Sequence, residues 1–274
     1  MVSDNANDVN DGDQVYSSAT SASANDPSNI RIPVVVIFND TTKQPNLIGK
    51  FRLMVSSLIG NLRKPPGSSA TAVDLYVISD PASFQTARGT VDRIVAVQKS
   101  RAERLKLHQL SAEDIANQIL RALSDDLLNN FRYKPKAYYG SALFFLSLVS
   151  HSVVELSHLN RMILVDADLK FKADIADLFA EFDKFSAKNL IGIGHELSPV
   201  YRHVFTRYRN ENPERSNVVG APQAVNRGGN PGFNSGVMLI DLDRIRNDAG
   251  FVEKIGQEFV AGLAKKYMFK GHLG

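Results

Sequence analysis

Two aspartates separated by one residue, Asp166 and Asp168, are the side chains whose types and spacing point most directly to chemistry. They follow Met162 to Val165, an apolar run typical of a strand that is buried on both faces. Neighbouring carboxylates repel each other unless a cation lies between them, and a hard divalent ion that also binds a phosphate suits their oxygen atoms. A solvated turn after the strand would also explain the triplet. The position after a buried strand favours the metal site.

A second chemically suggestive segment is residues 230–241, with the sequence NPGFNSGVMLID. In it, Gly232 and Gly236 flank Asn234 and Ser235. Glycines let the backbone pass close to a ligand, and an amide between them could point into that ligand. We therefore expect this segment to contribute to a binding site.

A lone histidine and a lone glutamate, His195 and Glu196, follow a third apolar run. Single residues of these types at a strand end are more often hydrogen-bonded surface residues than ligands. We assign them no role, and no residue of the sequence is assigned as a catalytic nucleophile.

The elements that must position these side chains alternate between strands and helices. Apolar and β-branched runs predict strands at 32–38, 73–79, 162–165, 190–193 and 237–240, and a weaker one at 91–97. Apolar periodicity predicts helices over 47–58, 99–131, 137–149, 173–185 and most of 243–267. In the helix at 99–131, Leu105 and Leu107 begin the apolar stripe, and Ser111 to Asp114 has the spacing of a capping box. This alternation predicts an α/β fold with a mainly parallel sheet.

Composition limits the functional class. The 274 residues are 43% hydrophobic and carry a net charge of +3 with no cysteine, so a disulfide framework and a thiolate metal site are excluded. Basic and aromatic residues form no array suited to nucleic acid, and no apolar run approaches the roughly 20 residues that span a bilayer. Residues 1–30 are mostly Asp, Asn, Ser and Ala without a signal peptide, which predicts a disordered segment before one domain at 31–274.

The first predicted strand, at 32–38, is typical of a nucleotide-binding unit with the base and ribose near its end. No G-x-G-x-x-G follows it, which argues against a dinucleotide-dependent oxidoreductase. Asn39-Asp40-Thr41, after the strand, is also a glycosylation sequon, and we expect it to be unused because it would face a ligand.

Several stretches together resemble the retaining nucleotide-sugar glycosyltransferases with a GT-A fold, glycosyltransferase family 8, and within it the xylosyltransferases. These stretches are LVDADL, IADLFAEFDKF, AYYGSALFFLS, PVYRHVF, NPGFNSGVMLIDL and KGHLG. The resemblance implies transfer of xylose from UDP-xylose to a xylosyl-glucose O-glycan on EGF-like repeats, assisted by Mn²⁺. It also implies the lumen of the endoplasmic reticulum, a membrane anchor that this sequence does not display, and a possible homodimer.

The resemblance also implies roles for individual residues. Asp166 and Asp168 would bind the metal, and Ala167 would lie beside the donor sugar. The uridine pocket would be lined by Ile37, Phe38 and Asn39. Gly232, Asn234 and Ser235 would approach the sugar, and the acceptor would meet Tyr201, Arg202, His203 and Phe205. Retention without a carboxylate nucleophile implies attack on the face that the leaving group departs from.

The sequence departs from the family in three places. Ser141 stands where the family has an acidic residue, and residues 1–30 lack the family's membrane helix. The family continues past GHLG with a segment that grips the donor sugar and a histidine that is the third metal ligand, so we expect the C-terminal part to be missing. A non-catalytic fragment that binds UDP-sugars, or a family 8 transferase of other specificity, remains the alternative.

Overall fold

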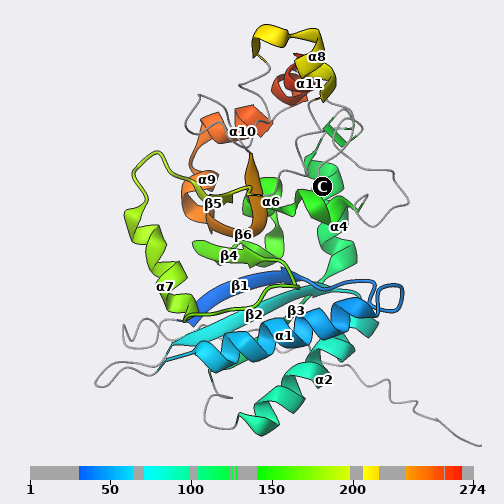
Figure 1. Cartoon of the computed structure of the whole chain (residues 1–274), viewed down its shortest axis with the longest axis vertical. Coiled ribbons are helices and arrows are strands. Elements are labelled where there is room, and N and C mark those ends of the chain that lie inside the picture. The colour runs from blue at the N-terminus through cyan, green and yellow to red at the C-terminus, as the bar shows by residue number, and fades with distance from the viewer. Residues whose placement is uncertain are drawn as a thin grey trace, which may run out of the picture.

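The computed structural model describes residues 31–63, 71–98, 104–123, 125, 127–128, 141–197, 206–215, 232–255 and 257–266. They form one six-stranded sheet with helices on both faces (Figure 1). The strands are β1 (Arg31–Ile37), β2 (Ala72–Ser79), β3 (Leu105–Ser111), β4 (Arg161–Val165), β5 (Ile191–His195) and β6 (Phe233–Asp241). The helices are α1 (Asn46–Asn61), α2 (Pro81–Val97), α4 (Ala112–Ala122), α6 (Leu146–Val149), α7 (Ile175–Phe179), α8 (Thr206–Glu211), α9 (Leu242–Arg246), α10 (Ala249–Ile255) and α11 (Gln257–Lys266). Short 3-10 helices include η2 (Ala142–Phe145), η3 (Ser150–Ser152), η4 (Val154–Leu156), η5 (Ala180–Lys184) and η7 (Pro213–Arg215).

The strand order is β3-β2-β1-β4-β6-β5. Strands β1 to β4 are mutually parallel, whereas β6 runs antiparallel to both of its neighbours, β4 and β5. The chain builds outward from β1 to β3 and then returns to place β4 on the other side of β1. Open α/β sheets bind ligands at such a switch point, outside the carboxyl ends of the strands. The predicted α/β fold with a mainly parallel sheet is therefore confirmed.

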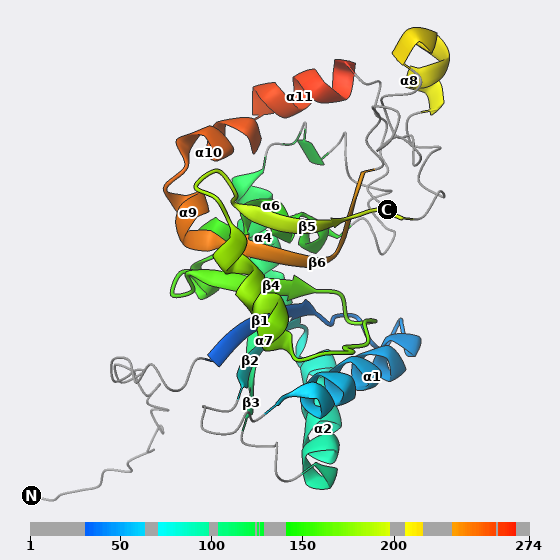
Figure 2. The same ribbon diagram turned by 60° about the vertical axis from the view of Figure 1, so that its left-hand side comes forward.

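Helices cover both faces of the sheet, which explains why β1 and β4 are apolar without alternation. On one face, α1, α2, α7 and η5 form what we call the α1-side core, which includes Phe51, Leu58, Ala87, Ile175 and Phe182. On the other face, α4, η2, α6 and α9 form the α4-side core, which includes Ile115, Ile119, Leu146, Leu242 and Ile245. Figure 2 shows α9, α10 and α11 on the side of the molecule opposite to α1 and α2.

Two predictions of secondary structure are wrong. Residues 91–97 are the end of α2 instead of a weak strand, because Asp80 caps that helix through the Ser83 N–H and Pro81 occupies its first turn. Leu105 and Leu107 belong to β3, whose residues pair with β2, instead of a helical stripe. The capping residue was identified correctly, since the Ser111 side chain accepts a hydrogen bond from the Asp114 N–H at the start of α4.

The other predicted elements are present with shifted bounds. The helix expected over 173–185 is divided into α7 and η5, with Asp174 as its capping residue. The core helix expected over 137–149 corresponds to η2 and α6, and its residues 137–140 lie outside the described part of the chain. Residues 1–30 lie outside it too. Among the described residues, no helix has both the length and the apolar character needed to cross a membrane.

Candidate active site

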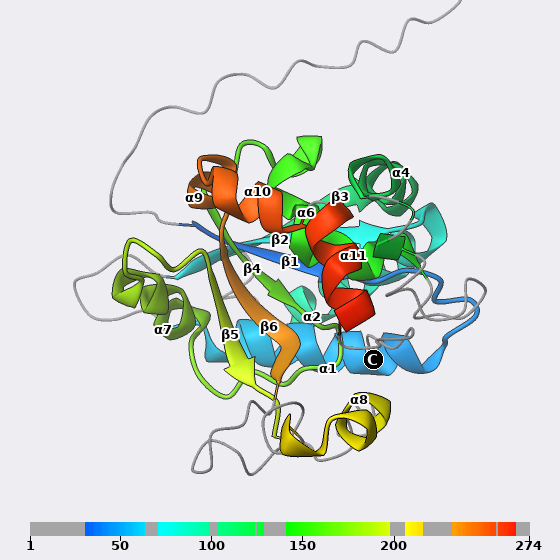
Figure 3. The same cartoon turned by 90° about the horizontal axis from the view of Figure 1, so that it is seen from above.

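The candidate site lies at the edge of the sheet where β1 and β4 end and β6 begins. Strand β6 pairs with β4 so that Val237 is opposite Val165. One residue further along, the Asp166 N–H donates a hydrogen bond of 2.9 Å to the Gly236 carbonyl. Figure 3 shows β4, β6 and β5 side by side in this order. The antiparallel insertion of β6 thus joins the two segments that the sequence singled out for chemistry.

The three residues after β4 alternate between solvent and core. The side chains of Asp166 and Asp168 are exposed, whereas Ala167 is buried in the α1-side core. Surrounding protein atoms displace water from the Asp166 carboxylate and thereby raise its pKa, and the neighbouring charge of Asp168 raises this pKa further. The charged form of Asp166 is therefore disfavoured, and a bound cation would favour it.

The segment at the start of β6 is folded tightly against Asp166. The Asn234 side chain accepts a hydrogen bond of 2.9 Å from the Gly236 N–H and donates one of 3.1 Å to Glu196 Oε2. A Cβ atom on Gly236 would lie 3.0 Å from Asn234 Oδ1 and 3.1 Å from Asp166 Oδ2, closer than side chains normally pack. The glycine is needed here because it lets β6 approach the carboxylate. In the structure the amide of Asn234 orients this turn. The ligand contact expected for it from the sequence stays a prediction.

The entry to β6 and the exit from β5 are also joined. Gly232 has a φ of +91°, a left-handed conformation that side chains strongly disfavour, and its carbonyl accepts a 3.1 Å hydrogen bond from the Glu196 N–H. The rings of His195 and Phe233 stack with centroids 5.4 Å apart. His195 and Glu196, to which the sequence analysis gave no role, therefore border the site. Ser235, next to Asn234 in the chain, is exposed.

The end of β1 supplies the other wall of the site. Ile37 is half-buried, and the Phe38 side chain is fully buried with its ring stacked on Phe51 at 4.2 Å between centroids, so Phe38 can meet a ligand only through its backbone. Asn39 Oδ1 accepts a 2.7 Å hydrogen bond from the Asp80 N–H. Asp40 has a φ of +56°, and its N–H donates to Asp80 Oδ2 at 2.8 Å. The loop after β1 is thereby fixed to the first turn of α2.

A lysine that the sequence analysis missed contacts this site. Lys50 Nζ on α1 lies 3.0 Å from Asp168 Oδ2. The two residues are 118 positions apart, and an isolated lysine on the polar side of a helix gives no local signal of such a role.

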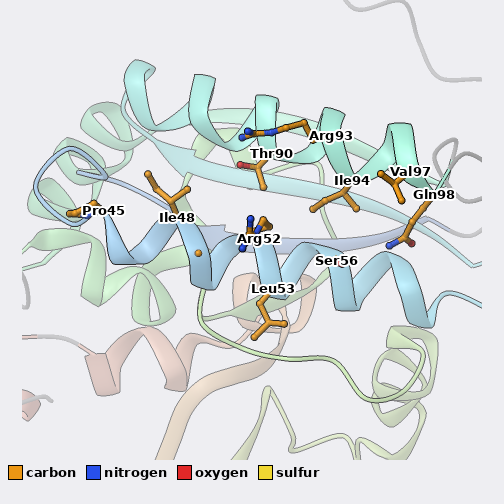
Figure 4. Close-up of a pocket in the computed structure, with 11 residues that line it drawn as sticks. Pro45, Ile48, Arg52, Leu53, Ser56, Thr90, Arg93, Ile94, Val97 and Gln98 are labelled. Carbon is orange, nitrogen blue, oxygen red and sulfur yellow. The ribbon is translucent and has the colours of Figure 1, made fainter.

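Some predicted site residues cannot be placed. The acceptor residues Tyr201, Arg202, His203 and Phe205 lie outside the described residues. Ser141, where the family has an acidic residue, caps η2 by accepting a hydrogen bond from the Leu143 N–H. A cavity of about 750 Å³ lies between α1 and α2, and none of the predicted site residues lines it (Figure 4).

The donor set fits a hard divalent cation as far as the described chain provides it. Within the described ranges no group of three or more His, Asp or Glu side chains could hold a metal. Asp166 and Asp168 offer two carboxylates at an exposed strand end, and partial burial together with the charge of Asp168 raises the pKa of Asp166. Two protein carboxylates with substrate phosphates are a usual coordination for Mg²⁺-like ions.

Comparison with known proteins identifies the family of the chain and several similar proteins. Residues 53–255 match the sequence model of glycosyl transferase family 8. Over 241 residues, the chain is 32% identical to xyloside xylosyltransferase 1 of Mus musculus and to that of Homo sapiens. Each match covers 88% of this chain and 58% of the relative. It is 29% identical over 187 residues to xylosyl- and glucuronyltransferase LARGE2s of Gallus gallus, covering 63% of this chain and 23% of the relative.

A solved structure supports the fold directly. The crystal structure of mouse xyloside xylosyltransferase 1 in its apo form is similar with a TM-score of 0.75 and 29% identity, and the match covers 89% of this chain and 79% of that one. The chain thus spans 58% of the length of the first two curated relatives that it matches.

Proposed function

Because the chain belongs to glycosyl transferase family 8, we propose that it takes part in the transfer of xylose from UDP-xylose to the xylose of a xylosyl-glucose O-glycan on EGF-like repeats. The observation that carries this proposal is the contact between Asp166, the first carboxylate of the pair, and Gly236 beside Asn234 at the switch point of the sheet. The choice of xylose follows the names of the relatives, in all of which xylosyl transfer appears.

The donor would lie across the edge of the sheet. Its uridine would meet the backbone of Ile37 and Phe38 and the side chain of Asn39, which the bond to Asp80 holds in place. Its sugar would lie near Ala167, Gly232, Asn234 and Ser235. The left-handed Gly232 and the close packing of Gly236 leave backbone, instead of bulky side chains, on that side of the site.

Asp166 and Asp168 would hold a divalent cation, which we propose to be Mn²⁺. Such an ion supplies charge compensation for the diphosphate as it departs. To bind it, both carboxylates must be ionised, and the positive charge of the cation would offset the repulsion between them. Asp166 and Asp168 would thus hold the cation at the carboxyl end of β4, where it would compensate the charge of the diphosphate.

In the reaction, the bond between the anomeric carbon and the β-phosphate oxygen breaks, and a bond from that carbon to the acceptor hydroxyl oxygen forms on the same face. The hydroxyl proton passes to the departing phosphate oxygen. Among the described residues, the site offers positioning and electrostatic compensation, as this front-face route requires. The two-carboxylate arrangement of glycosidases has a different purpose and is not the template here.

The acceptor and the compartment belong to the same proposal. The acceptor would meet Tyr201, Arg202, His203 and Phe205, and the reaction would take place in the lumen of the endoplasmic reticulum, where O-glycans of this kind would be extended. A transferase of other donor specificity is the second candidate, because relatives named for both xylosyl and glucuronyl transfer match 63% of this chain.

The test is turnover of a panel of UDP-sugars with Mn²⁺ and a xylosyl-glucose acceptor. We expect the chain to use UDP-xylose in preference to UDP-glucuronic acid and UDP-glucose. Faster turnover of another donor would assign a different specificity within the family. Binding of UDP without any transfer would favour the non-catalytic alternative.

A further inference from the structure

Lys50 is a cation on α1 that lies against Asp168, one of the two carboxylates of the candidate cation site. Its Nζ donates to Asp168 Oδ2 at 3.0 Å. The helix that carries it, α1, is anchored to the sheet by Phe51, Met54, Val55, Leu58 and Ile59, all buried. The direction in which Lys50 leaves the helix is therefore set by the α1-side core.

The segment that carries Asp168 is held to α1 by contacts that do not involve Lys50. The Phe171 N–H donates to Ser57 Oγ and the Phe171 carbonyl accepts from Asn61 Nδ2, both at 3.0 Å. The buried Asp174 accepts hydrogen bonds from the Arg63 N–H at 2.8 Å and from Thr71 Oγ1 at 2.9 Å. Removing the charge of Lys50 should therefore leave the backbone around Asp168 in place.

The ion pair itself contributes little to folding. Both side chains are about half exposed, at 55% for Lys50 and 46% for Asp168, and exposed pairs of this kind are screened by water and salt. Lys50 is thus not needed for stability, yet it contacts a carboxylate of the candidate cation site. We therefore expect it to affect the binding of ligands at that site.

We propose that Lys50 is a positioning residue that exchanges partners during donor binding. Without a cation, its ammonium compensates the charge of Asp168. When cation and nucleotide bind, the cation takes over the carboxylate and repels the ammonium, and the flexible lysine stem lets Nζ turn to the diphosphate that the cation brings beside it. This inference rests on the proposed function, because it requires that Asp166 and Asp168 hold a cation with a nucleotide diphosphate.

The exchange predicts opposite effects on the two ligands. Lys50→Met keeps the unbranched stem of the side chain and removes the terminal ammonium with its charge. Without the competing ammonium, Mn²⁺ alone should bind about threefold more tightly, as expected for the loss of a partly screened charge. In saturating Mn²⁺, UDP should bind about fivefold more weakly, because one charge-assisted hydrogen bond to the diphosphate is lost. Lys50→Arg should restore most of the UDP affinity.

The experiment is isothermal calorimetry with MnCl₂ alone and with UDP in saturating Mn²⁺. Lys184→Met is the matched control, because Lys184 forms a similar exposed pair with Glu181, 2.7 Å away, on η5 and outside the site. Opposite shifts in Lys50→Met, with none in Lys184→Met, support the exchange. If Lys50→Met binds both ligands like the unmodified chain, the proposal about Lys50 is wrong and the proposed function stands. If the unmodified chain binds neither Mn²⁺ nor UDP, the metal assignment and this inference fail together.

Discussion

At the scale of single residues, the candidate site depends on how closely Asp166 and Gly236 approach each other. Their backbones are hydrogen-bonded at 2.9 Å, and the Asp166 carboxylate occupies the space where a side chain at position 236 would begin. The sequence identified both residues from local composition, because an Asp-x-Asp after an apolar strand and a glycine-flanked Asn-Ser are visible in short windows. Lys50 was missed and Glu196 was given no role, since their partners are brought to them only by the fold.

Asp166→Asn and Asp168→Asn test the carboxylates. Each change removes an anionic oxygen ligand from an exposed strand end where little packing is lost, so we expect Mn²⁺-dependent UDP binding to fall at least tenfold while the thermal unfolding temperature stays close to that of the unmodified chain. Calorimetry with UDP and Mn²⁺ measures the first and a thermal melt the second. Asp183→Asn, at an exposed position of η5, is the control. Unchanged UDP affinity in both variants would show that the assignment of Asp166 and Asp168 as metal ligands is wrong.

Gly236→Ala tests the close approach. Its Cβ would meet Asn234 Oδ1 at 3.0 Å and Asp166 Oδ2 at 3.1 Å, so the Asp166 carboxylate must move and the affinity for Mn²⁺ with UDP should fall about tenfold, the factor that a displaced ligand worth about 1.4 kcal/mol gives. Gly194→Ala, on the adjacent strand, is the matched control because no atom lies within 4 Å of its Cβ position. Equal affinities for the two variants would show that the packing at position 236 does not shape the site.

At the scale of elements, the fold was predictable where a segment carries its own signal. Buried strands such as β1 and β4 are continuous apolar runs, and Ser111 marks the start of α4 by its own hydrogen-bonding chemistry. The end of α2 was mistaken for a strand because Val91, Ile94 and Val97 are β-branched, although packing against α1 and the sheet favours the helix. Strand β3 was mistaken for a helix because an edge strand is stabilised by its partner β2, which no local window contains.

The placement of β6 was beyond reach of the sequence for the same reason. Residues 237–240 were recognised as strand-like, yet nothing in them specifies that they run antiparallel between β4 and β5. The packing of both cores determines the position and direction of β6. This placement brings Gly236 to Asp166.

Asp80→Ala tests how an element boundary supports the site. Partial burial acts to raise the pKa of Asp80, but hydrogen bonds from the Ser83 side chain and backbone and from the Asp40 N–H outweigh it and lower the pKa. A carboxylate with a lowered pKa in the folded state stabilises the fold above the unfolded pKa of about 3.9, and this contribution is lost as the pH falls through the folded value. We expect Asp80→Ala to lower the free energy of unfolding by about 1–2 kcal/mol at neutral pH, as for the loss of a helix cap.

Urea unfolding at neutral pH and at a pH below the unfolded pKa of aspartate measures this difference. The difference in free energy of unfolding between Asp80→Ala and the unmodified chain should become smaller in acid. At neutral pH, the free energy of unfolding of Asp80→Asn, which keeps an acceptor but no charge, should lie between those two values. A gap that is the same at both pH values would mean that the charge of Asp80 contributes nothing to the cap.

At the scale of the whole molecule, one sheet supports two cores. The same strands contribute alternate side chains to each face, as in β2, where Leu75 and Val77 enter the α1-side core while Tyr76 and Ile78 enter the α4-side core. Neither layer of helices can therefore lose its packing without exposing the strands that serve the other. The described domain should unfold as one cooperative unit.

Leu58→Ala in the α1-side core and Leu146→Ala in the α4-side core test this cooperativity. Both side chains are 1% exposed, and each truncation should lower the free energy of unfolding by about 2–5 kcal/mol. Urea unfolding followed by far-UV circular dichroism and by tyrosine fluorescence should give a single shifted transition in each variant. Two separated transitions, each affected by one of the variants, would contradict a shared sheet.

The strand order also has a consequence for the sequence of events during synthesis. Strand β5 precedes β6 in the chain but lies outside it in the sheet, and its only ladder among the described strands is with β6. When residues 191–195 leave the ribosome, their pairing partner β6 has not yet been synthesised. The edge of β4 pairs with β6, which is made about 40 residues later, and not with β5. Assembly of the site must therefore wait for residues 233–241, because a nascent chain that ends before them lacks the strand that brings Gly236 to Asp166.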